Sequence, residues 1–340
     1  MLGNLLSKYM MKQLTTEKVP TIYPEKCINV RQRRMRCQEC ILACPEDALV
    51  LGRKIVLNQE KCTNCNRCAA VCPSVTFVPR TEVLEPLYQA IQQKESISIT
   101  CNKSTEKSSI KVGCLSELPW EFYAYIALDR QLILDCSYCE ECEDKQASQF
   151  IQKNIARLKE FMGECRFFEA VTIVSSKEES LECQYTRREL LTYLAHQGKQ
   201  KATFFAPFIF NQNEDARIYR SLLVSKVQRI NKEQKLDYGW NTVALGKKCY
   251  GCGVCEKLCP QNAISIKEEE GNYYFIGKCT HCGICKVVCN QKAIELTFIQ
   301  KDGSRLRTVY KIDVEHCKVC NDPIPPSLGG CCDICKRKQK

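Results

Sequence analysis

Cysteines are the residues of this chain with the most evident chemistry, numbering 28 among 340 residues. Residues 249–259 and 279–289 each have the spacing C-x2-C-x2-C-x3-C. Three thiolates on so tight a loop can hold one face of a cubane iron–sulfur cluster, whose fourth corner points away from the loop. A pair of zinc sites is the alternative, but zinc ligands usually come as C-x2-C pairs from two separate places. The spacing therefore favours iron–sulfur chemistry.

These two runs resemble the bacterial two-[4Fe-4S] ferredoxin domain, in which the fourth cysteine of each run binds the cluster of the other. The resemblance implies a Cys249 set and a Cys279 set. Their members are Cys249, Cys252, Cys255 and Cys289, and Cys279, Cys282, Cys285 and Cys259. Asn290 stands where the family usually has proline, which affects the turn and not the ligands. We expect His281 to be a loop residue or a hydrogen-bond donor, because four thiols are already present.

A second copy of the motif lies near the N-terminus, with one arm displaced. Residues 62–72 form a complete run, but the run at 37–44 has Arg34 where its first cysteine belongs. Cys27 is the nearest replacement, and the intervening residues can loop outward. The exchange rule then gives a Cys62 set and a Cys27 set. Their members are Cys62, Cys65, Cys68 and Cys44, and Cys27, Cys37, Cys40 and Cys72. Alternatively Cys27 is free, and its site is open or holds a three-iron cluster.

The displaced arm carries four arginines within residues 31–36. One interpretation is a basic, solvated loop without further function. The other is electrostatic, because positive charge near a cluster raises its reduction potential and can also dock an acidic partner. Both interpretations stay open at the level of the sequence.

Five further cysteines fall in the middle of the chain, near the ends of predicted strands. They are Cys101, Cys114, Cys136, Cys139 and Cys142. Their layout loosely resembles the small subunit that links nickel–iron hydrogenase to heterodisulfide reductase, although the spacing does not match cleanly. That resemblance implies an additional iron–sulfur centre, with zinc or redox-active thiols as alternatives. Cys165 and Cys183 are expected to be ordinary thiols.

The C-terminal tail has two C-x2-C pairs separated by a turn-rich linker. The predicted ligands are Cys317, Cys320, Cys332 and Cys335. Cys331 could replace Cys332. Two such knuckles are typical of a zinc ribbon, and a fifth iron–sulfur cluster is the alternative.

Short apolar runs and helical spacing define the elements that position these cysteines. We predict strands at 96–100, 109–115, 131–136 and 170–176, and helices at 118–128 and 145–163. Alternating strands and helices favour a small parallel sheet. Hairpins are expected between paired cysteine runs, within 45–61 and within 263–277.

The predicted fold class is α+β, with two dicluster modules flanking an α/β middle domain and a zinc-ribbon-like tail. The expected divisions are an N-terminal tail (1–20), module 1 (21–80), the middle domain (81–240), module 2 (241–300) and the C-terminal tail (301–340).

The formal charge of +11 counts every cysteine as neutral. A cubane with four thiolates carries about −2, so four clusters would leave about +3. No basic stripe with interleaved aromatics is present, and nucleic-acid binding is not expected. No apolar stretch is long enough to span a membrane, and the N-terminus lacks a secretory pattern. We therefore expect a cytoplasmic metalloprotein.

No dinucleotide fingerprint or phosphate-binding loop is found, and only three histidines occur. The sequence predicts electron transfer through four [4Fe-4S] clusters, in a subunit of a larger oxidoreductase such as a hydrogenase or formate dehydrogenase. The alternatives are a redox enzyme that uses the middle cysteines and a redox-sensing or assembly protein.

Overall fold

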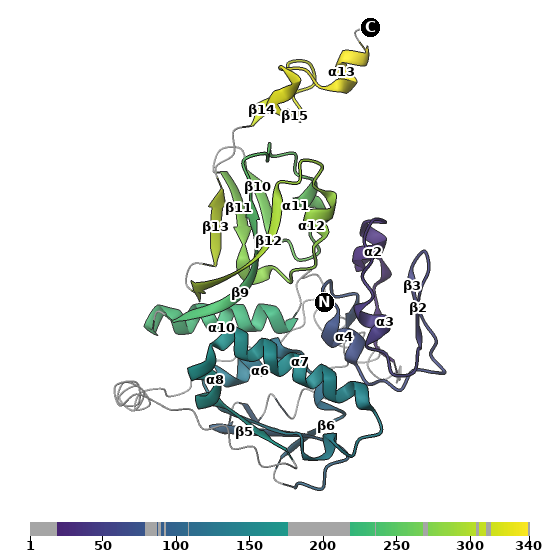
Figure 1. Cartoon of the computed structure of the whole chain (residues 1–340), viewed down its shortest axis with the longest axis vertical. Helices are drawn as coiled ribbons and strands as arrows, with labels where there is room; N and C mark the ends of the chain where they lie inside the picture. Colours follow the sequence, from purple (N-terminus) through teal and green to yellow (C-terminus); the bar gives the residue numbers. More distant parts are fainter. Residues whose placement is uncertain are drawn as a thin grey trace, which may run out of the picture.

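A computed structural model describes residues 19–78, 87, 90–91, 93–107, 109–175, 218–234, 236–267, 271–303, 306–310 and 314–338. Cys183 and most of the predicted N-terminal tail lie outside these residues. The described parts form an elongated molecule with the C-terminal tail at one end and the middle domain at the other (Figure 1). Within the described residues, no helix is long and apolar enough to cross a membrane.

The middle domain is built on a four-stranded sheet with the order β6-β5-β7-β8. The strands are β5 (Ser96–Cys101), β6 (Ile110–Val112), β7 (Gln131–Asp135) and β8 (Val171–Val174). All three strand pairs are parallel, as the sequence predicted. The carboxyl ends of the strands therefore meet at one edge of the sheet, where the middle cysteines lie.

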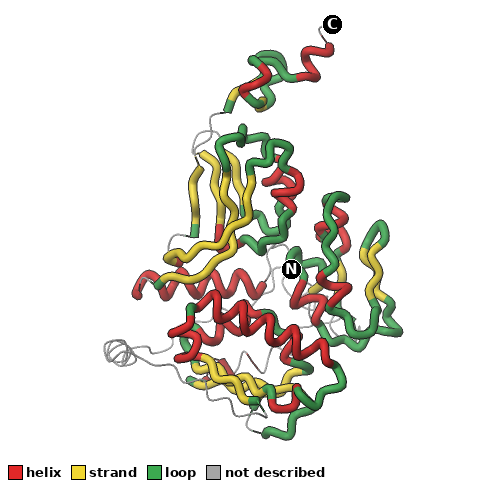
Figure 2. The backbone as a smooth tube through the Cα atoms, in the orientation of Figure 1, coloured by secondary structure: helices red, strands yellow, loops and turns green. Residues whose placement is uncertain are grey.

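Helices α6 (Trp120–Ala127), α7 (Lys145–Met162) and α8 (Glu164–Ala170) lie between this sheet and the strands of module 2 (Figure 2). Helix α7 begins where the Asp144 side chain accepts a hydrogen bond from the Ala147 N–H at 3.1 Å. It ends at Gly163, whose φ of 79° suits glycine. Its apolar side chains Ile151 and Leu158 are buried.

Helix α10 (Ile218–Gln234) packs on α6 and joins the middle domain to module 2. The sequence did not predict the strand that follows it, β9 (Asp237–Leu245). This strand pairs antiparallel with β12 (Ile294–Asp302) over its whole length, so module 2 starts before the boundary predicted at residue 241. Trp240 of β9 is fully buried and contacts Phe161 of α7 edge-on, with ring centroids 5.0 Å apart.

Module 2 also contains α11 (Val254–Leu258), α12 (Ile284–Val288) and a three-stranded antiparallel sheet. That sheet comprises β10 (Ile264–Lys267), β11 (Gly271–Phe275) and β13 (Arg307–Tyr310). The hairpin β10–β11 is the one predicted between the cysteine runs, whereas β13 comes from the range assigned to the tail.

Module 1 repeats the plan with shorter elements. It comprises η1 (Pro24–Lys26), α2 (Ile28–Arg31), α3 (Glu39–Leu42) and α4 (Arg67–Val71). The predicted hairpin is β2 (Leu49–Leu51) with β3 (Ile55–Leu57), and β1 (Thr21–Ile22) pairs with β4 (Phe77–Val78). The tail consists of the hairpin β14 (Glu315–His316) with β15 (Pro323–Ile324), η7 (Pro326–Leu328) and α13 (Asp333–Lys338).

Candidate metal centres

The cysteine loops of both modules curl through left-handed backbone conformations. The residue two places after the first cysteine, and the residue just after the second, have positive φ in the three complete runs. The values are Asn64 58°, Asn66 56°, Gly251 74°, Gly253 73°, His281 60° and Gly283 79°. Such curling brings successive thiols to one side of the loop. The incomplete run departs from the pattern, since Gln38 has a φ of −125°.

A second repeat follows the fourth cysteine of three runs. The backbone N–H four residues later donates a hydrogen bond to the cysteine sulfur, which stabilises negative charge there. The pairs are Ala48 to Cys44 at 3.2 Å, Ala263 to Cys259 at 3.3 Å and Ala293 to Cys289 at 3.3 Å. In the remaining run, Cys72 instead lies 3.6 Å from the Ser74 hydroxyl. The two modules therefore share a ligand-loop design.

The Cys249 set comes together across module 2. Burial raises the pKa of Cys255 to about 12, and the charges of Cys249, Cys252 and Cys289 raise it further. Cys289 belongs to the second run yet lies beside the thiols of the first. An exchange of fourth cysteines, which the ferredoxin resemblance implies, would need Cys289 in this place.

The Cys279 set lines a pocket with an empty volume of about 330 Å³. Burial raises the pKa of Cys282 to about 12, with contributions from the charges of Cys259 and Cys279. The backbone N–H of His281 donates to the Cys279 sulfur at 3.3 Å. The ring of His281 is half-buried, and burial followed by the charge of Arg157 lowers its pKa. His281 is therefore a loop residue that donates through its backbone.

The Cys62 set assembles in module 1. Burial raises the pKa of Cys68, and the charges of Cys65 and Cys62 add to this. Burial also raises the pKa of Cys65, with a contribution from the charge of Cys44. Cys44 of the incomplete run therefore lies near the thiol of Cys65.

Cys27 lies with the other thiols of its set in spite of the displaced arm. A pocket with an empty volume of about 360 Å³ is lined by Cys27, Cys37, Cys40 and Cys72. Burial raises the pKa of Cys40 to about 12, and the charges of Cys72, Cys37 and Cys27 raise it further. A raised pKa means that burial makes the thiolate costly to form. A bound metal cation offsets this cost, because it neutralises the negative charge of the thiolate. Each of the four sets contains two thiols whose pKa is raised by burial.

The displaced arm is held by a two-way hydrogen bond. The Asn29 amide donates to the carbonyl oxygen of Cys37 at 2.7 Å, and its oxygen accepts from the Cys37 N–H at 3.0 Å. Residues 28–31 form helix α2, and Arg33, Arg34 and Arg36 are exposed to solvent. Sequence reasoning missed Asn29, although its place two residues after Cys27 marks the start of the arm.

The spacing of the thiols distinguishes the tail from the modules. Tetrahedral zinc with Zn–S bonds of about 2.3 Å holds its sulfurs about 3.8 Å apart. Within the described residues, one group of three or more Cys, His, Asp or Glu ligand atoms lies within 4.8 Å of one another: Cys317, Cys320, Cys332 and Cys335. The thiols of the four module sets are more widely spaced. That spacing fits a polynuclear cluster better than a single ion.

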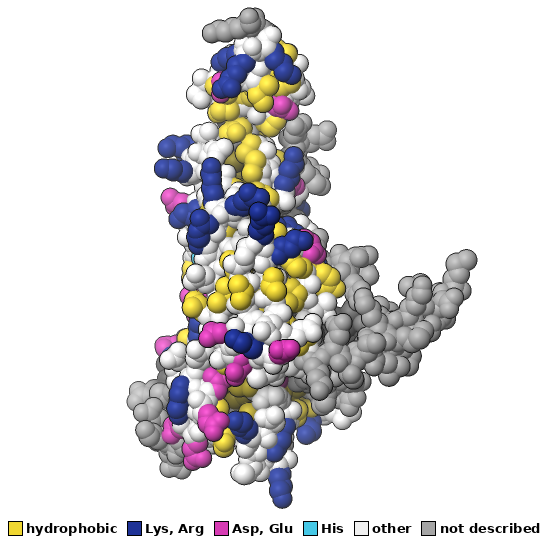
Figure 3. Space-filling model, turned by 90° about the vertical axis from the view of Figure 1, so that its right-hand side faces the viewer, with side chains coloured by type: hydrophobic (Ala, Val, Ile, Leu, Met, Phe, Trp, Pro, Cys, Tyr) yellow, Lys and Arg dark blue, Asp and Glu magenta, His cyan; other side chains and the backbone are white. Residues whose placement is uncertain are grey.

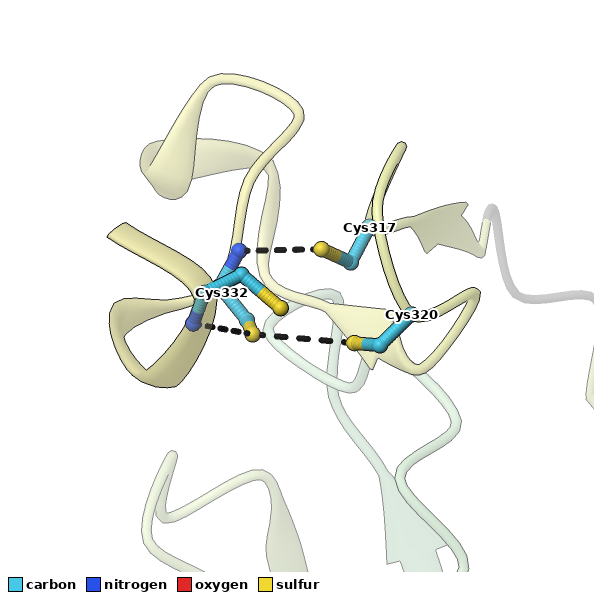
Figure 4. Close-up of side chains that lie close together, drawn as sticks. Cys317, Cys320 and Cys332 are labelled. Atoms are coloured by element: carbon cyan, nitrogen blue, oxygen red, sulfur yellow. Dashed lines mark hydrogen bonds between the residues drawn. The ribbon is translucent and has the colours of Figure 1, made fainter. Parts of the chain in front are cut away.

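The sulfurs of Cys317, Cys320 and Cys332 lie close together (Figure 4). Cys320 and Cys332 sulfurs are 3.7 Å apart, and the Cys332 N–H donates to the Cys317 sulfur at 3.3 Å. Backbone N–H groups of Cys320, Cys332 and Val319 lower the pKa of Cys317 to about 5. Cys331 lies outside the group and contacts the carbonyl oxygen of Cys332. The tail thus has a thiolate cage with the dimensions of a mononuclear site.

The two modules touch directly at their ligand loops. The carbonyl oxygen of Pro73 accepts hydrogen bonds from the Gln261 amide and the Thr280 hydroxyl, both at 2.9 Å. Pro73 follows Cys72, and Thr280 follows Cys279, so ligand loops of two sets share this contact. Beside it, Ile28 of α2 packs with Ile284 and Val288 of α12 in a small buried cluster. Sequence spacing contained no signal for this junction.

Among the middle cysteines, Cys101, Cys114, Cys136 and Cys139 gather at the carboxyl edge of the parallel sheet, and Cys142 lies in the loop beyond them. Cys165 is exposed on α8. No cysteine in the described residues forms a disulfide bond.

Two family models match the chain: a 4Fe-4S dicluster domain at residues 33–76 and a 4Fe-4S binding domain at 247–265. The first match begins after Cys27. A curated relative, the pyruvate synthase subunit PorD of Thermotoga maritima, is 35% identical over 69 residues, which are 19% of this chain and 63% of that subunit. The match thus spans less than two thirds of the relative. No solved structure matches the chain significantly. The chain therefore carries two ferredoxin-type 4Fe-4S domains, one in each cysteine-rich module.

Proposed function

We propose that this chain transfers electrons through four [4Fe-4S] clusters in one continuous series, as a subunit of a larger cytoplasmic oxidoreductase complex. The observation that carries the proposal is the junction at Pro73, where ligand loops of the two modules are hydrogen-bonded to each other. Two ferredoxin domains that served separate partners would not need their ligand loops in contact.

Contacts between the sets give the order of the series. Cys68 of the Cys62 set is near enough to Cys40 of the Cys27 set for the Cys40 charge to raise its pKa. In module 2, the charge of Cys255 of the Cys249 set likewise raises the pKa of Cys285 of the Cys279 set. Pro73 then joins the Cys27 set to the Cys279 set. The order is the Cys62, Cys27, Cys279 and Cys249 sets.

Iron–sulfur clusters supply one-electron redox chemistry, at potentials set by charge, hydrogen bonds to sulfur and exposure. The residues of this chain fix where each ligand set lies and keep water from the junction. Ile28 and Ile284 are almost wholly buried there. The displaced arm therefore has two roles in the series. It places Cys27 beside the other thiols of its set, and it provides the apolar contact with module 2.

Redox partner proteins are expected at the exposed surface of module 1. The PorD relative is by name a subunit of pyruvate synthase, and a hydrogenase or formate dehydrogenase is an equally suitable kind of partner. Arg33, Arg34 and Arg36 are exposed, and so are Leu42 and Val50. Lysine and arginine side chains gather over the upper half of the face in Figure 3, whereas acidic ones gather lower down. Such a surface favours an acidic partner.

The tail is proposed to hold zinc through Cys317, Cys320, Cys332 and Cys335. Its sulfur spacing matches a tetrahedral thiolate site, and two knuckles are the usual source of such ligands. Zinc has no redox chemistry of its own, so the tail's role in this scheme is structural.

The test is anaerobic purification of the full chain with iron, sulfide and zinc analysis and EPR of the reduced protein. The proposal expects at least about sixteen irons and about one zinc per chain, with EPR signals broadened by interacting clusters. Thr280→Val should keep the iron and slow electron exchange between the modules. Thr172→Val, an exposed threonine on β8, is the matched control. Low iron with several zinc ions per chain would overturn the proposal.

A further inference from the structure

Parallel pairing brings cysteines from three neighbouring strands to one edge of the middle sheet. Thr100 pairs with Asp135, so Cys101 at the end of β5 is level with Cys136 just after β7. Cys101 also pairs with Val112 of β6, and Cys114 follows two residues later. The strand register alone therefore places Cys101 between the other two. The carboxyl edge of a parallel sheet is where ligands usually bind.

Cys139 joins this group through a single turn of 3₁₀-helix, η3 (Ser137–Cys139), in which its N–H donates to the Cys136 carbonyl at 2.9 Å. The thiols of Cys136 and Cys139 are hydrogen-bonded to each other. This bond raises the pKa of Cys136, and the nearby charge of Cys101 also contributes. Burial raises the pKa of Cys114, and the nearby charge of Cys139 also contributes. Four thiols thus form one connected group, which we call the edge thiols.

Asp135 braces the two loops that carry them. Its carboxylate accepts hydrogen bonds from the Thr100 hydroxyl at 2.9 Å and the Ser104 hydroxyl at 3.2 Å. It also accepts from the N–H of Ser137 at 3.0 Å and the hydroxyl of Ser137 at 2.6 Å. The segment after Cys101 and the segment after Cys136 are therefore fixed to one side chain. Four donors on one buried carboxylate indicate a preorganised site.

Arg67 connects the edge thiols to module 1. It lies in α4 between Cys65 and Cys68, and its side chain is 2% exposed. Its guanidinium forms an ion pair with Asp144 and donates to the Ser116 hydroxyl at 2.8 Å. Ser116 in turn donates to the Cys114 sulfur at 3.1 Å. A continuous run of contacts thus leads from the Cys62 set to the edge thiols.

We propose that Cys101, Cys114, Cys136 and Cys139 hold a fifth metal centre, a polynuclear iron–sulfur cluster, at the Cys62 end of the electron-transfer series. The proposal rests on the proposed function of the two modules. One electron given up by the neighbouring centre is gained by this one, so no further reactant is required. The centre would be the terminal of the series nearest to a partner that docks on the middle domain.

Three observations favour a cluster over the alternatives. A redox dithiol needs two cysteines, and here four gather. Zinc needs sulfurs about 3.8 Å apart, whereas no three of these thiols lie within 4.8 Å of one another. A cluster with four thiolates is negatively charged, and Arg67 supplies a buried positive charge beside it. Burial raises the pKa of both Cys65 and Cys114, and the positive charge of Arg67, which lies between them, opposes that rise in each.

The test compares iron content in full-length, anaerobically purified protein. Cys136→Ala and Cys114→Ala should each lose about two to four irons per chain and keep the [4Fe-4S] EPR signals of the modules. Cys139→Ser is the substitute if either variant fails to fold. Cys142→Ala and Cys165→Ala, which change cysteines outside the group, should retain all iron.

Unchanged iron in Cys136→Ala and Cys139→Ser overturns the proposal, as does loss of one zinc instead of iron. Loss of iron in Cys142→Ala would overturn the ligand assignment. If the unmodified chain itself holds far fewer than about sixteen irons, the proposed function fails as well, so the two failures are distinguishable.

Arg67 provides a second, independent measurement. Arg67→Met should lower the reduction potentials of the fifth centre and the Cys62 set much more than that of the Cys249 set, because the Coulomb energy falls with distance and the Cys249 set is at the other end of the series. Arg67→Lys, which keeps the charge, should restore them in part. Potentials that do not move in Arg67→Met would contradict the placement of the fifth centre beside module 1.

Discussion

Replacing Cys27 by alanine removes one proposed ligand of one cluster. Cys27 is 9% exposed and lines the same pocket as Cys37, Cys40 and Cys72, although nine residues separate it from Cys37. A [4Fe-4S] cluster presents four corner irons, each of which needs a ligand. Without Cys27 one corner is open. We expect the variant to lose about four irons per chain, or about one if a three-iron cluster persists.

Iron and sulfide analysis of anaerobically purified protein measures this loss, and EPR assigns it to one of four clusters. A three-iron cluster would give a distinct signal in the oxidised protein, where intact [4Fe-4S] clusters are silent. Cys165→Ala removes an exposed thiol of α8 and is the matched control. Cys101→Ala should leave all four clusters of the modules intact, because Cys101 lies in the middle domain.

Unchanged iron content and EPR in Cys27→Ala would refute the reasoning about the displaced arm. The shared pocket and the mutual charges would then reflect packing of a free thiol. Helix α2 would have to be explained by its contact with module 2 alone, and the Cys27 set would be a three-thiol site.

Three further results are expected. Asn29→Ala removes both hydrogen bonds to Cys37 and should speed loss of one cluster in air, measured by the decay of absorbance near 400 nm. Ile28→Ala empties part of the module junction and should cost about 2–5 kcal/mol locally, seen as a lower melting temperature, whereas Ile334→Ala, 66% exposed, should not. Cys332→Ser should lose about one zinc per chain and Cys331→Ser should lose none, since only Cys332 belongs to the tail group.

Local patterns in the sequence predicted a large part of the fold. The C-x2-C spacings located the cysteine runs, and the alternation of strands and helices over residues 96–176 predicted the parallel sheet. Both signals are local, because a ligand loop and an apolar periodicity each depend on residues that are close together in the sequence. Strand β9 was missed for the opposite reason. Its partner β12 begins about fifty residues later, and its pairing, not its own pattern, makes it a strand.

The contacts between the parts could not be predicted. Gln261, Thr280 and Pro73 are ordinary loop residues in the sequence, and only the fold brings them together. The buried contacts of charged residues could not be predicted either, because arginine is rarely fully buried and is expected at the surface. Arg67 inside a ligand run gave no sign that it would reach Ser116, far along the chain.

Buried arginines also bear on the role of the exposed ones. Arg220 of α10 donates to the carbonyl oxygens of Gly277 and Cys279 at 2.7 and 2.8 Å, so the ligand loops of both modules have a buried guanidinium beside them. A charge in the low-dielectric interior acts on a neighbouring cluster far more strongly than one in water, where salt screens it within about 10 Å. Arg67 and Arg220 would therefore act on the potentials of neighbouring clusters more strongly than exposed arginines would. Exposed arginines within residues 31–36 are poorly placed to tune potentials, which favours their other role, the docking of an acidic partner.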